Sequence, residues 1–179
     1  MKVEKEIIKR IEQAEKLYAQ YGKTISNDET VKDIIAHLEQ VIEKRRRCMI
    51  SCGMTDICRR CDTEEGGSCC GKGIEARYDE WLLLINLLLG CNLPRERYED
   101  NSCLFLGKDG CILKALHVIC INYLCKKIEE RVSRDDLLRL RDMEGDMIAA
   151  IFCLHEYLKR SYSKHEISEK DPAKACTVL

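Results

Sequence analysis

Apolar residues recur at spacings of three and four over the first 21 residues, which places them on one face of an α-helix. The sequence therefore predicts an amphipathic helix over this stretch. We expect the helix to end at Gly22, because glycine is common immediately after a helix. The apolar stripe consists of Val3, Ile7, Ile8, Ile11, Ala14, Leu17, Tyr18 and Tyr21.

A second amphipathic stripe starts at Val31 and continues toward the basic run KRRR at 44–47. The preceding sequence SNDE has Glu29 three residues after Ser26, which is the form of a capping box at a helix start. The second helix is expected to pass the arginines and to extend as far as Cys52. Because only a short polar link separates the two helices, they are predicted to pair antiparallel.

The composition changes sharply between Cys48 and Cys125, where all but two of the 13 cysteines occur. Within this region YDEWLLLINLLLG has acidic residues at its start and Gly90 at its end, and it predicts a buried helix. In SCLFLGKDGCIL, two short apolar pieces flank a Gly-Lys-Asp-Gly turn. This pattern predicts a hairpin that brings Cys103 and Cys111 together.

Helical periodicity returns at Ile112 and again in a long final stretch that opens with SRDD at 133–136. The predicted fold is all-α, with a helical bundle that frames a cysteine-rich metal-binding insert containing one short hairpin. The predicted regions are an N-terminal helical hairpin at 1–47, a cysteine-rich metal-binding region at 48–130, a C-terminal helix at 131–164 that completes the bundle, and a flexible tail at 165–179.

Charge and hydropathy restrict the environment in which the chain is expected to work. The 30 Lys and Arg residues nearly balance the 31 Asp and Glu residues, so no nucleic acid is expected as a partner. The longest apolar run, WLLLINLLLG, is far shorter than the roughly 20 residues of a membrane span, so no membrane is expected either. The charged N-terminal stretch lacks the apolar segment of a signal peptide, which predicts a cytoplasmic protein with reduced thiols.

The cysteines carry the candidate chemistry. In ICRRCDTEEGGSCCGKG, Cys58 and Cys61 form a C-x2-C pair expected in a tight turn, and Cys69 and Cys70 are adjacent. An odd total of 13 cysteines in a reducing compartment favours bound metal or redox thiols over disulfides. The predicted ligand pool for a metal or cofactor is Cys58, Cys61, Cys69, Cys70, Cys103, Cys111, Cys120 and Cys125.

The order CRRC, GGSCC, CLFLGKDGC and a further cysteine resembles the YkgJ-like zinc/iron-chelating cysteine-cluster family, whose members are also described as iron–sulfur oxidoreductases. The resemblance covers roughly the middle third of the chain. This sequence has ALHVIC where the family has an Arg-Pro pair before the later cysteine. The resemblance implies metal binding more directly than any reaction. It rests on Cys58, Cys61, Cys69, Cys70, Cys103, Phe105, Leu106, Gly110, Cys111 and Cys120.

The donor set favours an iron–sulfur cluster of the 4Fe–4S type, because soft thiolates dominate, a second C-x2-C pair is absent, and His117 is the only histidine among them. Such a cluster would serve electron transfer or small-substrate redox or sulfur chemistry. The expected partner is a redox protein or a small molecule, and whether the protein is an oxidoreductase stays open. The alternatives are a zinc-stabilised helical interaction module, a metal carrier without catalysis, and a metal-free thiol centre.

Other cysteines are weaker candidates. Cys48 and Cys52 are four residues apart and would share one helix face, and Cys91 follows a helix end, so each could add a ligand. His117 and Cys153 are expected to have structural roles, because a lone histidine and a cysteine in an apolar stripe are usually core residues. The final CTVL has the form of a prenylation motif, which we attribute to chance.

Overall fold

The computed structural model describes residues 2–64 and 69–163, and within these ranges the fold is all-α with one two-stranded antiparallel hairpin. The predicted helical bundle with a short hairpin is therefore confirmed. In chain order the elements are α1 (Lys2–Asn27), α2 (Glu29–Ser51), α3 (Met54–Thr63), the 3-10 helix η1 (Ile74–Arg77), α4 (Glu80–Leu88), β1 (Leu106–Gly107), β2 (Gly110–Cys111), α5 (Val118–Asn122), α6 (Lys126–Arg131) and α7 (Arg134–Tyr162).

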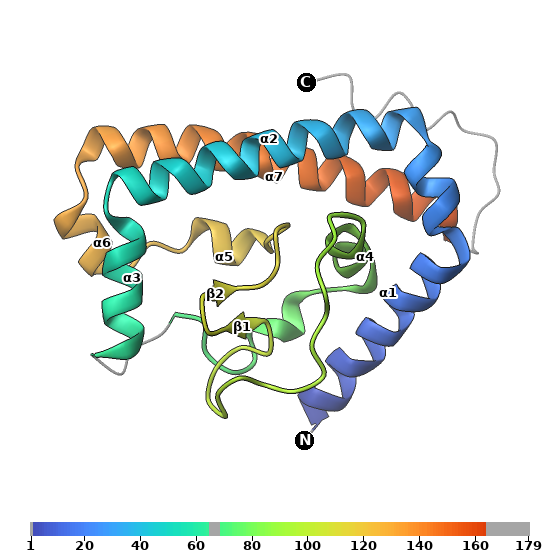
Figure 1. The fold of residues 1–179 in the computed structure, drawn as a ribbon, viewed down its shortest axis with the longest axis horizontal. Helices are drawn as coiled ribbons and strands as arrows, with labels where there is room; N and C mark the ends of the chain where they lie inside the picture. The colour runs from blue at the N-terminus through green and yellow to red at the C-terminus, as the bar shows by residue number, and fades with distance from the viewer. Residues whose placement is uncertain (1, 65–68, 164–179) are drawn as a thin grey trace.

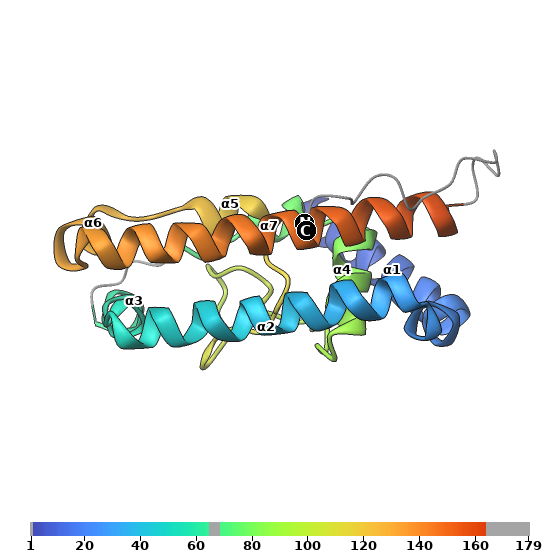
Figure 2. The same ribbon diagram turned by 90° about the horizontal axis from the view of Figure 1, so that it is seen from above.

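Two long helices, α2 and α7, run antiparallel and side by side along one edge of the molecule (Figures 1 and 2). At one end α1 turns away from α2 and packs along α4. The prediction that α1 and α2 pair antiparallel with each other is therefore wrong. The reason is that α4 buries residues all around its circumference, from Trp81 to Asn86, and needs a helix on more than one side.

The junction between α1 and α2 also differs from the sequence prediction. Helix α1 continues through Gly22, because the fully buried Ile25 extends its apolar stripe. Burying an isoleucine side chain contributes about 1.5–3 kcal/mol, more than the roughly 1 kcal/mol that a glycine costs inside a helix. The cap of α2 is Asp28, whose Oδ1 accepts the backbone N–H of Val31 at 3.2 Å, while Ser26 lies within α1.

The buried apolar side chains form two separate cores. The larger core joins α1, the first part of α2, α4, the hairpin and the second part of α7. The smaller core joins the end of α2, α3, α6 and the start of α7 through Met54, Ile57, Ile128, Val132 and Leu140. The cysteine-rich segments border both cores.

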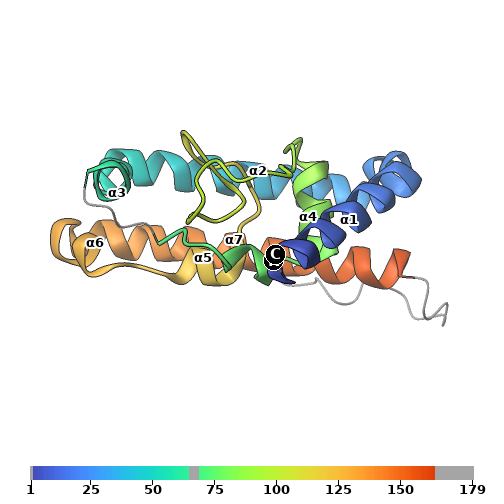
Figure 3. The ribbon, with the colours of Figure 1, turned by 90° about the horizontal axis from the view of Figure 1, so that it is seen from below.

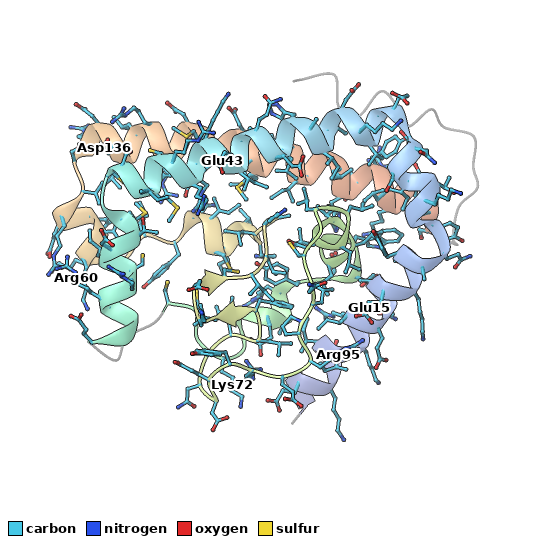
Figure 4. All side chains as sticks on the ribbon, viewed as in Figure 1. Glu15, Glu43, Arg60, Lys72, Arg95 and Asp136 are labelled. Atoms are coloured by element: carbon cyan, nitrogen blue, oxygen red, sulfur yellow. The ribbon has the colours of Figure 1, made fainter. Side chains whose placement is uncertain are left out.

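The remaining segments occupy the middle of the molecule, between the end formed by α3 and α6 and the end formed by α1 and α4 (Figures 1 and 3). On the outer surface Arg95 reaches Glu15 of α1, which ties the segment before the hairpin to that helix (Figure 4). Among the described residues, no helix has the length and apolar character to cross a membrane. The tail predicted from residue 165 and the CTVL motif lie outside the described ranges.

Candidate thiol centre

Cys58 and Cys61 lie on helix α3, so the prediction that this C-x2-C pair sits in a tight turn is wrong. Residues three apart on a helix share one face, so the spacing still directs both thiols to the same side. Helix α3 contacts α6, where Lys127 Nζ donates a hydrogen bond to Cys61 Sγ at 3.4 Å. Cys125 is the residue before α6 and contacts the smaller core. These three cysteines form the helical thiol group.

The second set of thiols gathers around the hairpin. Backbone pairing between Gly71 and Ser102 places Cys70 beside Cys103, whose N–H donates to the Cys70 carbonyl at 2.6 Å. Cys111 is on β2, opposite Leu106 of β1, as the predicted hairpin requires. Cys120 is on α5. We call Cys70, Cys103, Cys111 and Cys120 the hairpin thiol group.

Cys69 connects the two groups. Its sulfur lies close enough to Cys58 of the helical group, and to Cys70 and Cys120 of the hairpin group, for their thiolates to repel one another. Cys58 interacts in addition with its own group, namely Cys61 and Cys125. Within the hairpin group, Cys111 interacts with Cys103 and Cys120. All eight predicted cysteines therefore belong to one connected neighbourhood. The eight cysteines are Cys58, Cys61, Cys69, Cys70, Cys103, Cys111, Cys120 and Cys125.

The surrounding protein raises the pKa of five of these thiols, Cys58, Cys70, Cys103, Cys111 and Cys120. Burial raises the pKa of Cys103 to about 11, and its side chain is only 6% exposed. Cys111 keeps part of its surface in water, yet the protein around its sulfur raises its pKa to about 12. Desolvation likewise raises the pKa of Cys58 to about 11. The pKa of Cys70 is also raised, most by a hydrogen bond with Cys69 and next by burial.

Tyr78 connects the larger core to the thiols. Its ring is 1% exposed and packs edge-on against Phe105, with 5.1 Å between the ring centroids. The Tyr78 hydroxyl accepts the His117 N–H at 3.0 Å and points to Cys120 Sγ at 3.9 Å. His117 Nδ1 accepts the Ile119 N–H at 3.2 Å and so caps α5. His117 thus has the structural role that the sequence predicted.

A buried ion pair holds the segment that carries Cys70. Glu75 is fully buried and accepts hydrogen bonds from Arg97 and from the Gly73 N–H, the latter at 2.9 Å. Arg97 also donates to the Ser102 carbonyl. Burial alone would raise the pKa of Glu75, but these hydrogen bonds lower it overall. Sequence analysis missed this clamp, because neither residue belongs to a recognisable motif.

Asn86 holds the segment that leads from the hairpin to α5. Its Oδ1 accepts the N–H groups of Lys114 and Ala115 at 2.9 and 3.0 Å, and its Nδ2 donates to the carbonyls of Leu82 and Ala115 at 2.9 Å. The side chain is fully buried and every one of its polar atoms is used. The helix expected from Ile112 therefore starts only at Val118, after a non-helical stretch.

The weaker candidates lie apart from the connected thiols or have other contacts. Cys48 is buried in the smaller core and Cys52 is the C-cap of α2. Cys91 donates to Asn86 Oδ1 at 3.6 Å and, by the same electrostatic criterion, joins the connected thiols through Cys111. Cys153 is half-buried on α7, away from the centre. Cys176 lies outside the described residues.

The donor atoms suit a soft metal, but the described side chains do not form a preassembled site. Among residues 2–64 and 69–163, no three His, Cys, Asp or Glu side chains are close enough together to hold a metal ion. The eight thiols share a neighbourhood without converging on one point.

Comparison with known proteins adds no relative. No family model, no curated protein and no solved structure matches this chain. The resemblance to the YkgJ-like family therefore stays a prediction.

Proposed function

We propose that this protein is a cysteine-ligated metal-binding protein whose thiol centre holds an iron–sulfur cluster of the 4Fe–4S type. The observation that carries the proposal is the shared neighbourhood of the eight cysteines. Four separated parts of the chain supply them: α3, the segment at 69–70, the hairpin region and the region of α5 and α6. A metal centre draws its thiols from separate segments of the chain, and these segments bring theirs into one neighbourhood.

The type of donor favours iron–sulfur over zinc in this proposal. The pool exceeds four thiols, and the one nearby histidine, His117, uses its Nδ1 to cap α5. Soft thiolates without imidazole or carboxylate suit iron–sulfur clusters and other thiophilic metals. When bound, such a cluster supplies one-electron transfer or an iron site for a small substrate.

The protonation of the thiols argues against a metal-free nucleophilic centre. Reactive cysteines have a lowered pKa, whereas the pKa of Cys58 and Cys103 is raised to about 11. A metal can replace those protons, because it binds thiolate and releases the proton to water. Metal binding is therefore the chemistry for which these desolvated thiols are suited.

The same arrangement requires the side chains to adjust when metal binds. A change between staggered rotamers moves a cysteine sulfur by about 3 Å. Such changes would let thiols of one neighbourhood converge without a new backbone path, with the Glu75–Arg97 clamp and Asn86 holding their segments. We expect metal binding to be coupled to a local tightening of residues 69–125.

Structural zinc is the second candidate, and the two separate cores favour it. The hairpin group borders the larger core, and Cys125 contacts the smaller core. A zinc ion bound by thiols from both sides would crosslink the two cores and stabilise the fold. The long helices would then present a surface for a protein partner.

One experiment distinguishes an iron–sulfur cluster, structural zinc and a metal-free protein. The full-length protein is purified without oxygen, and iron, zinc and acid-labile sulfide are measured per chain, together with the visible absorption spectrum. Iron and sulfide in equal amounts with brown colour support the cluster. Zinc without colour supports the structural role. Protein that arrives metal-free and binds neither iron with sulfide nor zinc on reconstitution would overturn the proposal.

A further inference from the structure

Cys70 and Cys103 are direct neighbours across a short antiparallel pairing. Gly71 pairs with Ser102, and the flanking hydrogen bonds run from the Cys103 N–H to the Cys70 carbonyl at 2.6 Å and from the Lys72 N–H to the Asn101 carbonyl at 2.9 Å. In this register Cys70 lies opposite Cys103. Residues opposite each other in antiparallel strands direct their side chains to the same face.

The expected spacing of such a pair permits a disulfide. Opposed residues joined by a backbone hydrogen bond have Cα atoms about 5.5 Å apart, which falls within the range of about 4.4–6.8 Å found for disulfides. Their Cβ atoms are about 4.5–5.5 Å apart, whereas a disulfide prefers about 3.5–4.5 Å. The bond would form with a small inward movement, and the resulting strain would make it easy to reduce.

The two strands are held together without the bond. Glu75 accepts from the Gly73 N–H on one side, and Arg97 pairs with Glu75 while donating to the Ser102 carbonyl on the other. This clamp fixes both segments within three residues of the cysteines. The reduced pair is therefore already positioned, which lowers the entropic cost of closing the bond.

Other pairings in the hairpin thiol group are less favourable. The adjacent residues Cys69 and Cys70 cannot reach each other without strain, given the geometry of a disulfide. Cys111 lies opposite Leu106 in the hairpin register, so no cysteine faces it there. Cys70 lies within electrostatic range of both Cys111 and Cys103, and Cys103 is in addition opposite it in the backbone pairing.

We propose that Cys70 and Cys103 form a reversible cross-strand disulfide under oxidising conditions. The oxidant is a low-molecular-weight disulfide such as oxidised glutathione. Cys70, the more accessible thiol, loses its proton and attacks one sulfur of the oxidant, which releases one glutathione thiolate. Cys103 then loses its proton and attacks the Cys70 sulfur, which releases the second. The two protein protons end on the two glutathione thiols.

The bond would act as a slow redox switch. Cys103 is buried, which limits the access of the oxidant and makes the exchange slow. Two thiols of the centre would be withdrawn for as long as the bond persists. The disulfide itself does not depend on metal binding, so it can be tested on metal-free protein.

The test uses the full-length protein, reduced and treated with chelator, then incubated with oxidised glutathione at pH 8.5 and alkylated. Trypsin should release peptide 61–72, which contains Cys61, Cys69 and Cys70, and peptide 98–108, in which Cys103 is the only cysteine. We expect these two peptides to be joined, with fragmentation assigning the bond to Cys70. Dithiothreitol should separate them.

Matched variants sharpen the result. Cys61→Ser and Cys69→Ser should keep the linked peptides, whereas Cys70→Ser and Cys103→Ser should abolish the bond at Cys70. The wild-type digest decides the matter even if a variant fails to fold. Recovery of alkylated Cys103 after other cysteines have oxidised would overturn the proposal. So would a bond from Cys103 to Cys61, Cys69 or a cysteine outside peptide 61–72.

Discussion

Glu144 on α7 accepts two hydrogen bonds from Arg45 on α2, at 3.2 and 3.0 Å, although its side chain is only 2% exposed. Arg141 donates to the other carboxylate oxygen at 2.8 Å and also to the Asn122 carbonyl at 2.9 Å. One buried carboxylate therefore joins α2 to α7 and connects them to the end of α5. The sequence showed only a basic run at 44–47 within the second predicted helix.

Replacing Glu144 with alanine should destabilise the fold strongly. The change leaves Arg45 partly buried without its partner, and removing one member of a buried pair costs about 3–5 kcal/mol. Urea unfolding followed by circular dichroism measures the free energy of unfolding. Glu43→Ala is the matched control, because its pairs with Arg46 and Arg47 are exposed and should contribute little to stability. Equal losses for the two variants would contradict this account.

The pair formed by His155 and Asp79 should make stability depend on pH. His155 Nε2 and Asp79 Oδ2 are 2.8 Å apart, and this contact raises the pKa of His155 above its ordinary 6.5. Burial opposes ionisation of Asp79, but hydrogen bonds from His155 and the Leu82 N–H lower its pKa below 3.8 overall. Glu156 and Lys159 also act on the pair.

The sign of the effect follows from the two shifts. The His155 contribution is complete below pH 6.5 and is lost as the pH rises through its raised pKa. The Asp79 contribution is complete above pH 3.8 and is lost as the pH falls through its lowered pKa. The melting temperature of His155→Gln should therefore fall furthest below that of the wild type between pH 3.8 and pH 6.5. A difference from wild type that stays constant from pH 4 to pH 9 would exclude this pairing as the cause.

Asn86 should be needed for the stability of the segment before α5. In Asn86→Ala the buried N–H groups of Lys114 and Ala115 lose their acceptor, and each unsatisfied buried donor costs about 1–3 kcal/mol. Amide exchange should accelerate first at residues 113–121. Asn92→Ala, at an exposed position, is the control and should change little. Unchanged exchange in Asn86→Ala would show that another contact holds this segment.

Local signals in the sequence predicted those parts of the fold that local chemistry determines. Ser133 caps α7 by accepting the Asp136 N–H at 3.1 Å, as SRDD indicated. Gly90 and Gly110 have positive φ at the end of α4 and in the hairpin turn, where their sequence context predicted a helix end and a turn. Partner choice between helices was not predictable, because α1 and α2 present apolar stripes that fit several partners.

In the candidate site, too, some features could be predicted from the sequence and others could not. The cysteine spacing predicted a pool of candidate ligands, because residue type and order are visible in the chain. The groups that hold them were not predictable, since Arg97 and Glu75 are 22 residues apart and Arg45 and Glu144 are 99 apart. Helix α3 was missed because its two buried apolar residues, Met54 and Ile57, are too few for a periodic pattern.

The cysteines of the centre should differ from the others in their effect on metal content. Serine replaces a soft thiolate with a harder and poorer ligand, so the single changes Cys58→Ser, Cys61→Ser, Cys70→Ser and Cys111→Ser should each lower the metal bound per chain or alter the cluster spectrum. Cys153→Ser is the matched control, because Cys153 lies on α7 apart from the connected thiols. Measuring the melting temperature of each metal-free variant separates loss of a ligand from loss of the fold. If all four variants keep full metal content while Cys153→Ser loses it, the metal is bound elsewhere and the thiol centre has another role.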